Sequence, residues 1–196
     1  EDGKTAGEYA PIFFKQAKYT LLDQNTFWLC EKPDSVGMVG WDAALTRIAT
    51  WVKLQDKKTG QILMVVNTHF DHIGTEARRN SALLIIEKIK EIVGTSPAIL
   101  TGDFNVSEDW DAYKTITNNE FILKDAHKVA GKRTGVDFTY HNFGKIPAEK
   151  CEKIDFIFVT PQIRVISSYI PFSQLNDTLF LSDHNPEIVE LEIEKS

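Results

Sequence analysis

A helical pattern set between two strand patterns constrains the fold of this chain most. Ile62 to Thr68 is an apolar-rich run of strand length, and Ala98 to Thr101 is a shorter run of the kind that is buried as a central strand. Between them, Thr75 to Val93 places apolar residues three and four positions apart on one face, with Thr75 as the expected N-cap and Gly94 as the glycine that ends the helix. The pattern predicts a strand–helix–strand unit.

The remaining patterns predict mainly strands. They cover Ala10 to Phe14, Tyr19 to Leu22, Thr26 to Leu29, Leu45 to Leu54, Ile154 to Val159, Arg164 to Ile170 and Ile188 to Ile193. A second helix is predicted from Trp110 to Thr117. Because strands outnumber helices and hairpin connections mix with one strand–helix–strand unit, the sequence predicts a layered α/β protein with mixed sheets. Its 196 residues favour a single domain over 1–196.

Composition excludes several classes of protein. A net charge of −6 argues against a basic nucleic-acid coat, and no apolar run reaches the roughly 18 residues of a membrane helix. Cys30 and Cys151 lack the spacing of a zinc or redox motif, and they are either free thiols or one disulfide.

Polar residues cluster at or just beyond the ends of four predicted strands. The clusters are Asn67, His69, Asp71 and His72; Asp103 and Asn105; Asp155; and Asp183 with His184. Each cluster alone has a structural explanation, such as a turn cap or a paired buried carboxylate. Together they provide hard oxygen ligands for Mg²⁺ or Mn²⁺ and histidines for acid–base work. This combination indicates attack on a phosphoester by a metal-positioned water.

The segments NTHFDH, GDFN, KIDFIFV and SDHNP resemble, in order and approximate spacing, the motifs of the endonuclease/exonuclease/phosphatase superfamily. The resemblance runs from about Glu8 to Glu192, and Gly40 to Leu54 further resembles bacterial members of unassigned substrate. It implies the deoxyribonuclease-I-like fold, a four-layer α/β/β/α sandwich of two mixed sheets. It also implies a hydrolase that uses Mg²⁺ or Mn²⁺ on a nucleic acid, a phospholipid headgroup or a small phosphate, and no stable protein partner is predicted.

The resemblance also implies roles on the phosphate side of the site. His69 matches the histidine that contacts the scissile phosphate, and Glu8 matches the carboxylate that hydrogen-bonds this histidine. Arg47 matches a phosphate-side arginine, and Asn105 matches the asparagine that holds a phosphate oxygen.

Further roles are implied on the side of the water and the metal. Asp103 matches the aspartate that orients or activates the water, and it is also a candidate metal ligand. Asp183 matches a metal-binding aspartate, and Asp155 matches the carboxylate that pairs with His184. Whether Asp103 or His184 takes the proton stays open.

One departure concerns the start of the chain. The superfamily carries an Asn and a metal-binding Glu on strands upstream of the stretch that matches GEYAPIFF. We therefore expect an N-terminal segment, missing from this sequence, to supply them. Similar bacterial proteins are often exported, so the periplasm or secretion is the expected location.

Two other functions compete with this interpretation. His69, Asp71 and His72 fit the second half of the H-x-H-x-D-H signature of dizinc metallo-β-lactamase-type hydrolases, although Asn67 stands where the first His belongs. A non-catalytic binding module on the same fold is the other alternative. In either case, loop residues Trp41, Asp42 and Phe138 to His141 could flank a cleft or simply anchor the surface.

Overall fold

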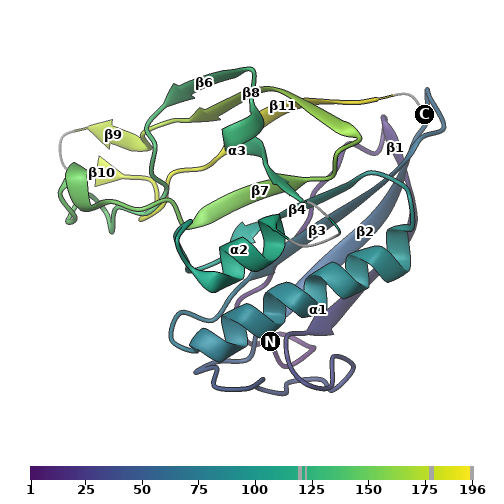
Figure 1. Cartoon of the computed structure of the whole chain (residues 1–196). Helices are drawn as coiled ribbons and strands as arrows, with labels where there is room; N and C mark the ends of the chain where they lie inside the picture. The colour runs from purple at the N-terminus through teal and green to yellow at the C-terminus, as the bar shows by residue number, and fades with distance from the viewer. Residues whose placement is uncertain (119–120, 122, 177–178, 195–196) are drawn as a thin grey trace.

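The computed structural model describes residues 1–118, 121, 123–176 and 179–194 (Figure 1). They form a large and a small β-sheet, a two-stranded ribbon and a layer of helices. The strands are β1 (Tyr19–Trp28), β2 (Ile48–Asp56), β3 (Ile62–His69), β4 (Ala98–Asp103), β5 (Lys124–Asp125), β6 (Lys132–Gly135), β7 (Asp155–Val159), β8 (Ile163–Ile170), β9 (Gln174–Asn176), β10 (Leu179–Phe180) and β11 (Ile188–Ile193). The helices are α1 (Thr75–Val93), α2 (Asp111–Thr117) and α3 (Ala126–Val129), with a 3₁₀ turn at Ala148–Lys150.

The predicted mixed-sheet α/β fold of the deoxyribonuclease-I-like type is confirmed. The large sheet has six strands in the order β1-β2-β3-β4-β7-β5, and the small sheet has three in the order β11-β8-β6. Both sheets are mixed, because β3 runs parallel to β4 and β6 runs parallel to β8 while the other pairs are antiparallel. The ribbon of β9 and β10 projects at one end (Figure 1).

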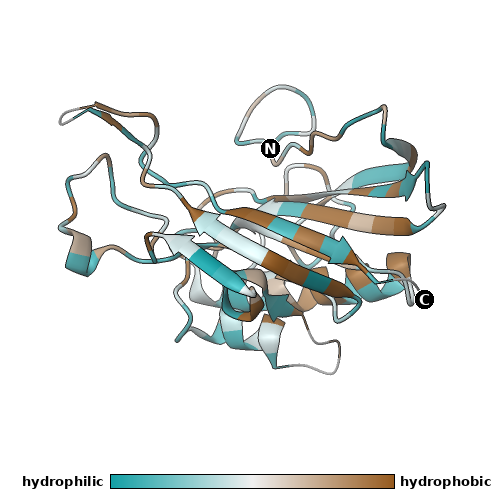
Figure 2. Cartoon of the chain, turned by 90° about the horizontal axis from the view of Figure 1, so that it is seen from above, coloured by the Kyte–Doolittle hydropathy of each residue, from teal (hydrophilic) through white to brown (hydrophobic). Residues whose placement is uncertain are grey.

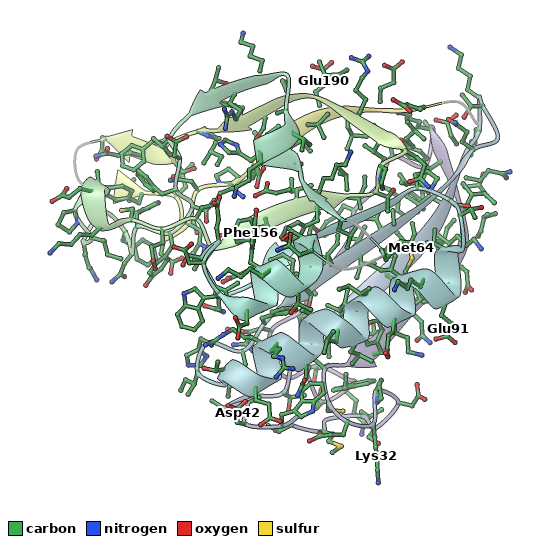
Figure 3. The ribbon with its side chains drawn as sticks, viewed as in Figure 1. Lys32, Asp42, Met64, Glu91, Phe156 and Glu190 are labelled. Atoms are coloured by element: carbon green, nitrogen blue, oxygen red, sulfur yellow. The ribbon has the colours of Figure 1, made fainter. Side chains whose placement is uncertain are left out.

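Side-chain alternation gives the large sheet two apolar faces. Met64, Leu100 and Phe156 point to the helices and join α1 in one core cluster (Figure 3). Their neighbours along the strands, such as Val65 and Ile99, pack instead against the small sheet. Because the strand period is two, every second residue at the ends of β3, β4 and β7 also faces the small sheet.

The outer face of the small sheet is polar. Glu190 and Glu192 of β11 are exposed, as is Arg164 of β8, which pairs with Glu192 (Figure 3). Among the described residues no helix lies over this face, so three of the four predicted layers are seen (Figures 1 and 2). These glutamates of β11 therefore form part of a solvated face.

Two predictions near the N-terminus are wrong. Ala10 to Phe14 forms no strand, and Pro11 in this segment has no N–H to donate to a ladder. The separate strands predicted for Tyr19 to Leu22 and Thr26 to Leu29 are one strand, β1, with a register shift between Leu21 and Asp23. The bulge inserts a residue without breaking the pairing with β2.

The start of α1 is capped from a distant loop. Gly74, not Thr75, occupies the N-cap position and offers no side chain. The carboxylate of Asp42 accepts hydrogen bonds instead from the N–H groups of Glu76 (3.2 Å) and Ala77 (2.7 Å). At the other end, Gly94 is the C-cap as predicted.

Two further expectations concern the cysteines and the membrane. Cys30 and Cys151 are both free thiols, so the disulfide alternative is wrong. None of the helices in the described ranges combines the length and the apolar character that crossing a membrane requires.

The contribution of the core beneath the GDFN segment to stability can be tested at Phe104. Its fully buried ring makes edge-on contacts with Phe70 and Phe158, at centroid distances of 4.9 and 5.2 Å. We expect Phe104→Ala to lower the unfolding free energy in urea by about 4 kcal/mol, through lost burial and a cavity. The control Phe13→Ala removes a ring that is 91% exposed and should change it by less than about 0.5 kcal/mol. Equal effects of the two variants would contradict the role of Phe104 in the core.

Candidate active site

A row of polar side chains crosses the end of the large sheet. Parallel pairing places His69 of β3 opposite Asp103 of β4, and antiparallel pairing places Asp103 opposite Asp155 of β7. The strands approach closely beside this row, since a Cβ on Gly102 would lie 2.1 Å from the carbonyl oxygen of Thr68. His69 Nε2 and Asp103 Oδ2 are 3.4 Å apart. The register therefore brings three predicted site residues together on the face toward the small sheet.

His184 joins this row from the loop before β11. Its Nδ1 lies 2.7 Å from Asp155 Oδ2, and its Nε2 lies 4.0 Å from Asp103 Oδ2. The ring of Tyr140 packs against the imidazole at a centroid distance of 4.9 Å. The predicted pairing of Asp155 with His184 thus has the geometry of a hydrogen bond, and it leaves Nε2 facing Asp103.

Glu8 and Arg47 form a second group behind His69. Glu8 Oε2 lies 3.2 Å from His69 Nδ1 and also pairs with Arg47 Nη1. Arg47 is only 4% exposed, and its Nη2 lies 3.4 Å from His72 Nδ1. In this conformation Arg47 reaches the site through Glu8 and not directly.

Asn105 and Asp183 lie beside the row. The Asn105 backbone has a φ of +49°, and its N–H donates to Asp103 Oδ1 while its Nδ2 donates to the carbonyl of Phe70, both at 2.9 Å. The left-handed conformation turns the chain sharply at the end of β4, a turn that Asn tolerates well. The Asp183 carboxylate accepts from Ser182 Oγ at 3.3 Å. It lies outside the tight group of Asp103, Asp155 and His184 described below.

Burial and neighbouring charge separate the pKa values of this row. Burial, followed by the charge of Asp155, raises the pKa of Asp103 to about 6. Burial, followed by the positive charge of Arg47, lowers the pKa of His69 to about 4 although Glu8 opposes the shift. For His184, burial alone would lower the pKa, but the hydrogen bond to Asp155 and the surrounding carboxylates raise it. At neutral pH the row therefore combines an ionised carboxylate with a neutral imidazole.

Three of these residues fit a divalent cation. Asp103, Asp155 and His184 each offer a ligand atom, and these atoms lie within 4.8 Å of one another. The two carboxylate oxygens suit Mn²⁺ or Mg²⁺, whereas the imidazole nitrogen is a ligand more typical of transition metals such as Zn²⁺. A cavity of about 420 Å³ that His69, Asp103 and Asp155 help to line adjoins them, with room for waters that such an ion keeps.

The loop that precedes β7 supports the row in a way that the sequence did not reveal. The buried hydroxyl of Thr139 accepts hydrogen bonds from the N–H groups of Ile154 and Asp155, both at 3.0 Å. With Tyr140 packed on His184, this loop holds the start of β7 and the histidine together. Thr139 and Tyr140 were candidates only for flanking the cleft, since a hydroxyl and a ring in a polar loop carry no signal of what they contact.

Asp71 ties two loops to the back of the site. Its carboxylate accepts hydrogen bonds from the N–H groups of Ala44, Leu45, Ile73 and Gly74, at 2.7 to 3.1 Å. Burial would raise the pKa of Asp71, but these four donors outweigh it and lower the pKa to about 2. The residue is a structural anchor next to His72.

The chain belongs to the endonuclease/exonuclease/phosphatase family, whose model matches residues 11–184. A solved endonuclease/exonuclease/phosphatase from Bacteroides vulgatus is 65% identical with a TM-score of 0.95, over 98% of this chain and 73% of that one. The mannosyl-6-phosphatase of Bacteroides thetaiotaomicron is 34% identical with a TM-score of 0.83, over 92% of this chain and 69% of that one. An uncharacterized protein of Acanthamoeba polyphaga mimivirus is 30% identical over 84% of this chain, which spans 63% of that protein.

The alternative of a dizinc metallo-β-lactamase-type hydrolase is wrong, because the chain belongs to a different family and two of the histidines that it would need have other partners. His127 contacts Ser168 Oγ through Nδ1 at 2.8 Å, and His141 Nδ1 accepts from the N–H of Gly144 at 3.0 Å. Among the described residues, the group of three or more potential metal ligands is Asp103, Asp155 and His184, which contains neither of these histidines nor His69.

The Asp71 anchor makes a prediction about acid stability. Its folded pKa of about 2 lies below the ordinary 3.8, so its stabilising effect is complete above about pH 4 and is lost as the pH falls toward 2. We expect this residue to account for about 2 kcal/mol of unfolding free energy. Urea unfolding should show Asp71→Asn less stable at pH 7 by about that amount, with a flatter decline between pH 4 and pH 2. Parallel declines in the two proteins would contradict the assignment.

Proposed function

We propose that the protein is a divalent-metal-dependent phosphoester hydrolase that directs water onto phosphorus in line with the leaving group. The observation that carries this proposal is that the strand register brings His69, Asp103 and Asp155 together and that His184 lies against them. Membership of a family that includes a phosphatase supports the proposal.

Asp103 is assigned the role of general base. A carboxylate with a pKa near 6 is ionised at neutral pH and still basic enough to take a proton. It lies between His69 and His184, so a water held there has a basic oxygen on one side and ring nitrogens on both flanks. The N–H of Asn105 holds the other carboxylate oxygen, which fixes the direction in which Oδ2 points.

His69 and His184 are assigned to the phosphoryl oxygens. Glu8 accepts from Nδ1–H of His69, so Nε2 of the neutral ring carries the lone pair. Nε2 donates to a phosphoryl oxygen only when the ring is protonated, which a bound phosphate dianion would favour. Asp155 holds Nδ1 of His184 and favours its charged form, which places a positive charge where negative charge develops. A divalent cation held by the carboxylates of Asp103 and Asp155, beside His184 and with Asp183 nearby, would further polarise the phosphoryl group and lower the pKa of a bound water.

A sugar phosphate is the first substrate class that we propose to test. The mannosyl-6-phosphatase of Bacteroides thetaiotaomicron is 34% identical to this chain over the aligned residues. The net charge of −6 disfavours long duplex DNA, because a duplex binder needs a basic surface. A panel of mannose 6-phosphate, glucose 6-phosphate, bis-p-nitrophenyl phosphate and single-stranded DNA separates the classes.

Replacing the base tests the proposal most simply. Asp103→Asn keeps the shape of the side chain but cannot take the proton, and we expect kcat/KM to fall about 100-fold or more. Asp34→Asn, at an exposed loop position, should leave kcat/KM within twofold. If the wild type hydrolyses no phosphoester, the proposal is wrong and a non-catalytic binding module is the better interpretation. Full activity in Asp103→Asn would instead contradict the assignment of Asp103 as the general base.

Metal removal provides a second prediction. After treatment with EDTA and desalting, hydrolysis should be lost and should return with Mn²⁺ or Mg²⁺. Binding can be followed independently, because Mn²⁺ bound to the protein should reduce the free-ion signal in electron paramagnetic resonance. Full activity in the metal-free protein would contradict the assigned cation.

A further inference from the structure

A buried ion pair is formed by two residues that lie close in sequence to Asp155 and His184. Lys153 precedes Asp155 by two positions, and Glu187 follows His184 by three. Lys153 Nζ lies 2.9 Å from Glu187 Oε2, and their side chains are only 6% and 2% exposed. No role was assigned to either residue from the sequence, since a Lys and a Glu in charged surroundings are usually solvated.

The pair is costly to bury, which calls for a compensating function. The attraction between two buried charges offsets the lost free energy of solvation only when their geometry is favourable and additional hydrogen bonds are made. Here Lys153 Nζ also donates to the carbonyl oxygen of Asp155 at 2.9 Å and lies 3.9 Å from the ring centroid of Phe156. Glu187 Oε1 accepts from the buried hydroxyl of Ser168 on β8 at 3.3 Å. The contacts thus join the first residue of β7, the loop before β11 and the small sheet.

Asn185, the residue that follows His184, is also held in place by hydrogen bonds. Asn185 donates its N–H to the carbonyl of Thr139 at 2.6 Å and its Nδ2 to the carbonyl of Phe138 at 3.3 Å, and its Oδ1 accepts from the N–H of Ser173. His184 therefore stands just before two fixed residues, Asn185 and Glu187. Its distance from Asp155 depends on how both hold the loop.

We propose that Lys153 and Glu187 are positioning residues that set the hydrogen bond between Asp155 and His184. Lys153 fixes the backbone of Asp155 through its carbonyl, and Glu187 fixes the loop of His184 to the same ammonium group. One cation thereby links the two halves of the dyad, which come from β7 and from the loop before β11. The inference rests on the proposed function only for its effect on catalysis, since the hydrogen bond can be observed without any substrate.

The test uses the pair-free variant Lys153→Met/Glu187→Met. Removing both charges avoids a lone buried charge, and such replacements are often neutral for stability. The readout is the low-field proton resonance of His184 Nδ1–H, identified by its absence in Asp155→Asn. We expect the double variant to shift or broaden this resonance while far-UV circular dichroism stays unchanged. With an active substrate, kcat should fall about 10- to 100-fold with KM within twofold, as is typical when partners of site residues are lost.

A matched control and a milder variant complete the design. Lys88→Met/Glu91→Met removes a pair of the same 2.9 Å length on the surface of α1, and it should change neither readout. Glu187→Gln keeps the side-chain shape and should move the resonance in the same direction to a smaller extent, which decides the question if the double variant does not fold.

The outcomes separate the two proposals. A wild-type resonance that survives unchanged in both Glu187→Gln and the double variant would overturn the positioning role. A resonance that responds as expected in a protein that hydrolyses no phosphoester would support the positioning role and contradict the proposed function.

Discussion

The pairing register of three strands is the constraint on which the site depends. His69, Asp103 and Asp155 are direct cross-strand neighbours, so backbone hydrogen bonds of the sheet set their spacing. A slip of one residue in either pairing would turn a side chain to the helix face, into the core that contains Met64 and Phe156. The packing of that core thus protects the register, and stability and the geometry of the site are linked through the same strands.

Differences in pKa then give the neighbouring side chains of the site different chemical roles. The three side chains share one edge of the sheet, yet burial shifts the pKa values of His69 and Asp103 in opposite directions, because it disfavours the charged form of each. Arg47 behind His69 and the carboxylate of Asp155 beside Asp103 add to these shifts. Similar partial burial therefore yields a neutral imidazole and a basic carboxylate within 3.4 Å of each other. Such separation of neighbouring titratable groups is typical of functional sites.

The sequence allowed the elements with strong periodicity and the strand-end residues of the site to be predicted. The predicted helices α1 and α2 and strands β3, β4, β7, β8 and β11 were confirmed, because their apolar spacing reflects burial. The short strands β5, β6, β9 and β10 were not predicted. The convergence of His69, Asp103 and Asp155 was predicted from motif order, whereas the register that produces it was not. What the sequence did not reveal depends on contacts between distant residues. Asp42 caps α1 from 34 positions away, and Lys153, just before β7, pairs with Glu187, just before β11. A side chain's partner in such a contact leaves no local pattern in the sequence.

The account as a whole requires that these strand ends form one cation site. The most direct measurement is anomalous diffraction from a crystal soaked in Mn²⁺. The account predicts a single strong anomalous peak within coordination distance of carboxylate oxygens of Asp103 and Asp155, beside His184. A peak elsewhere on the molecule, or none at saturating Mn²⁺, would contradict it.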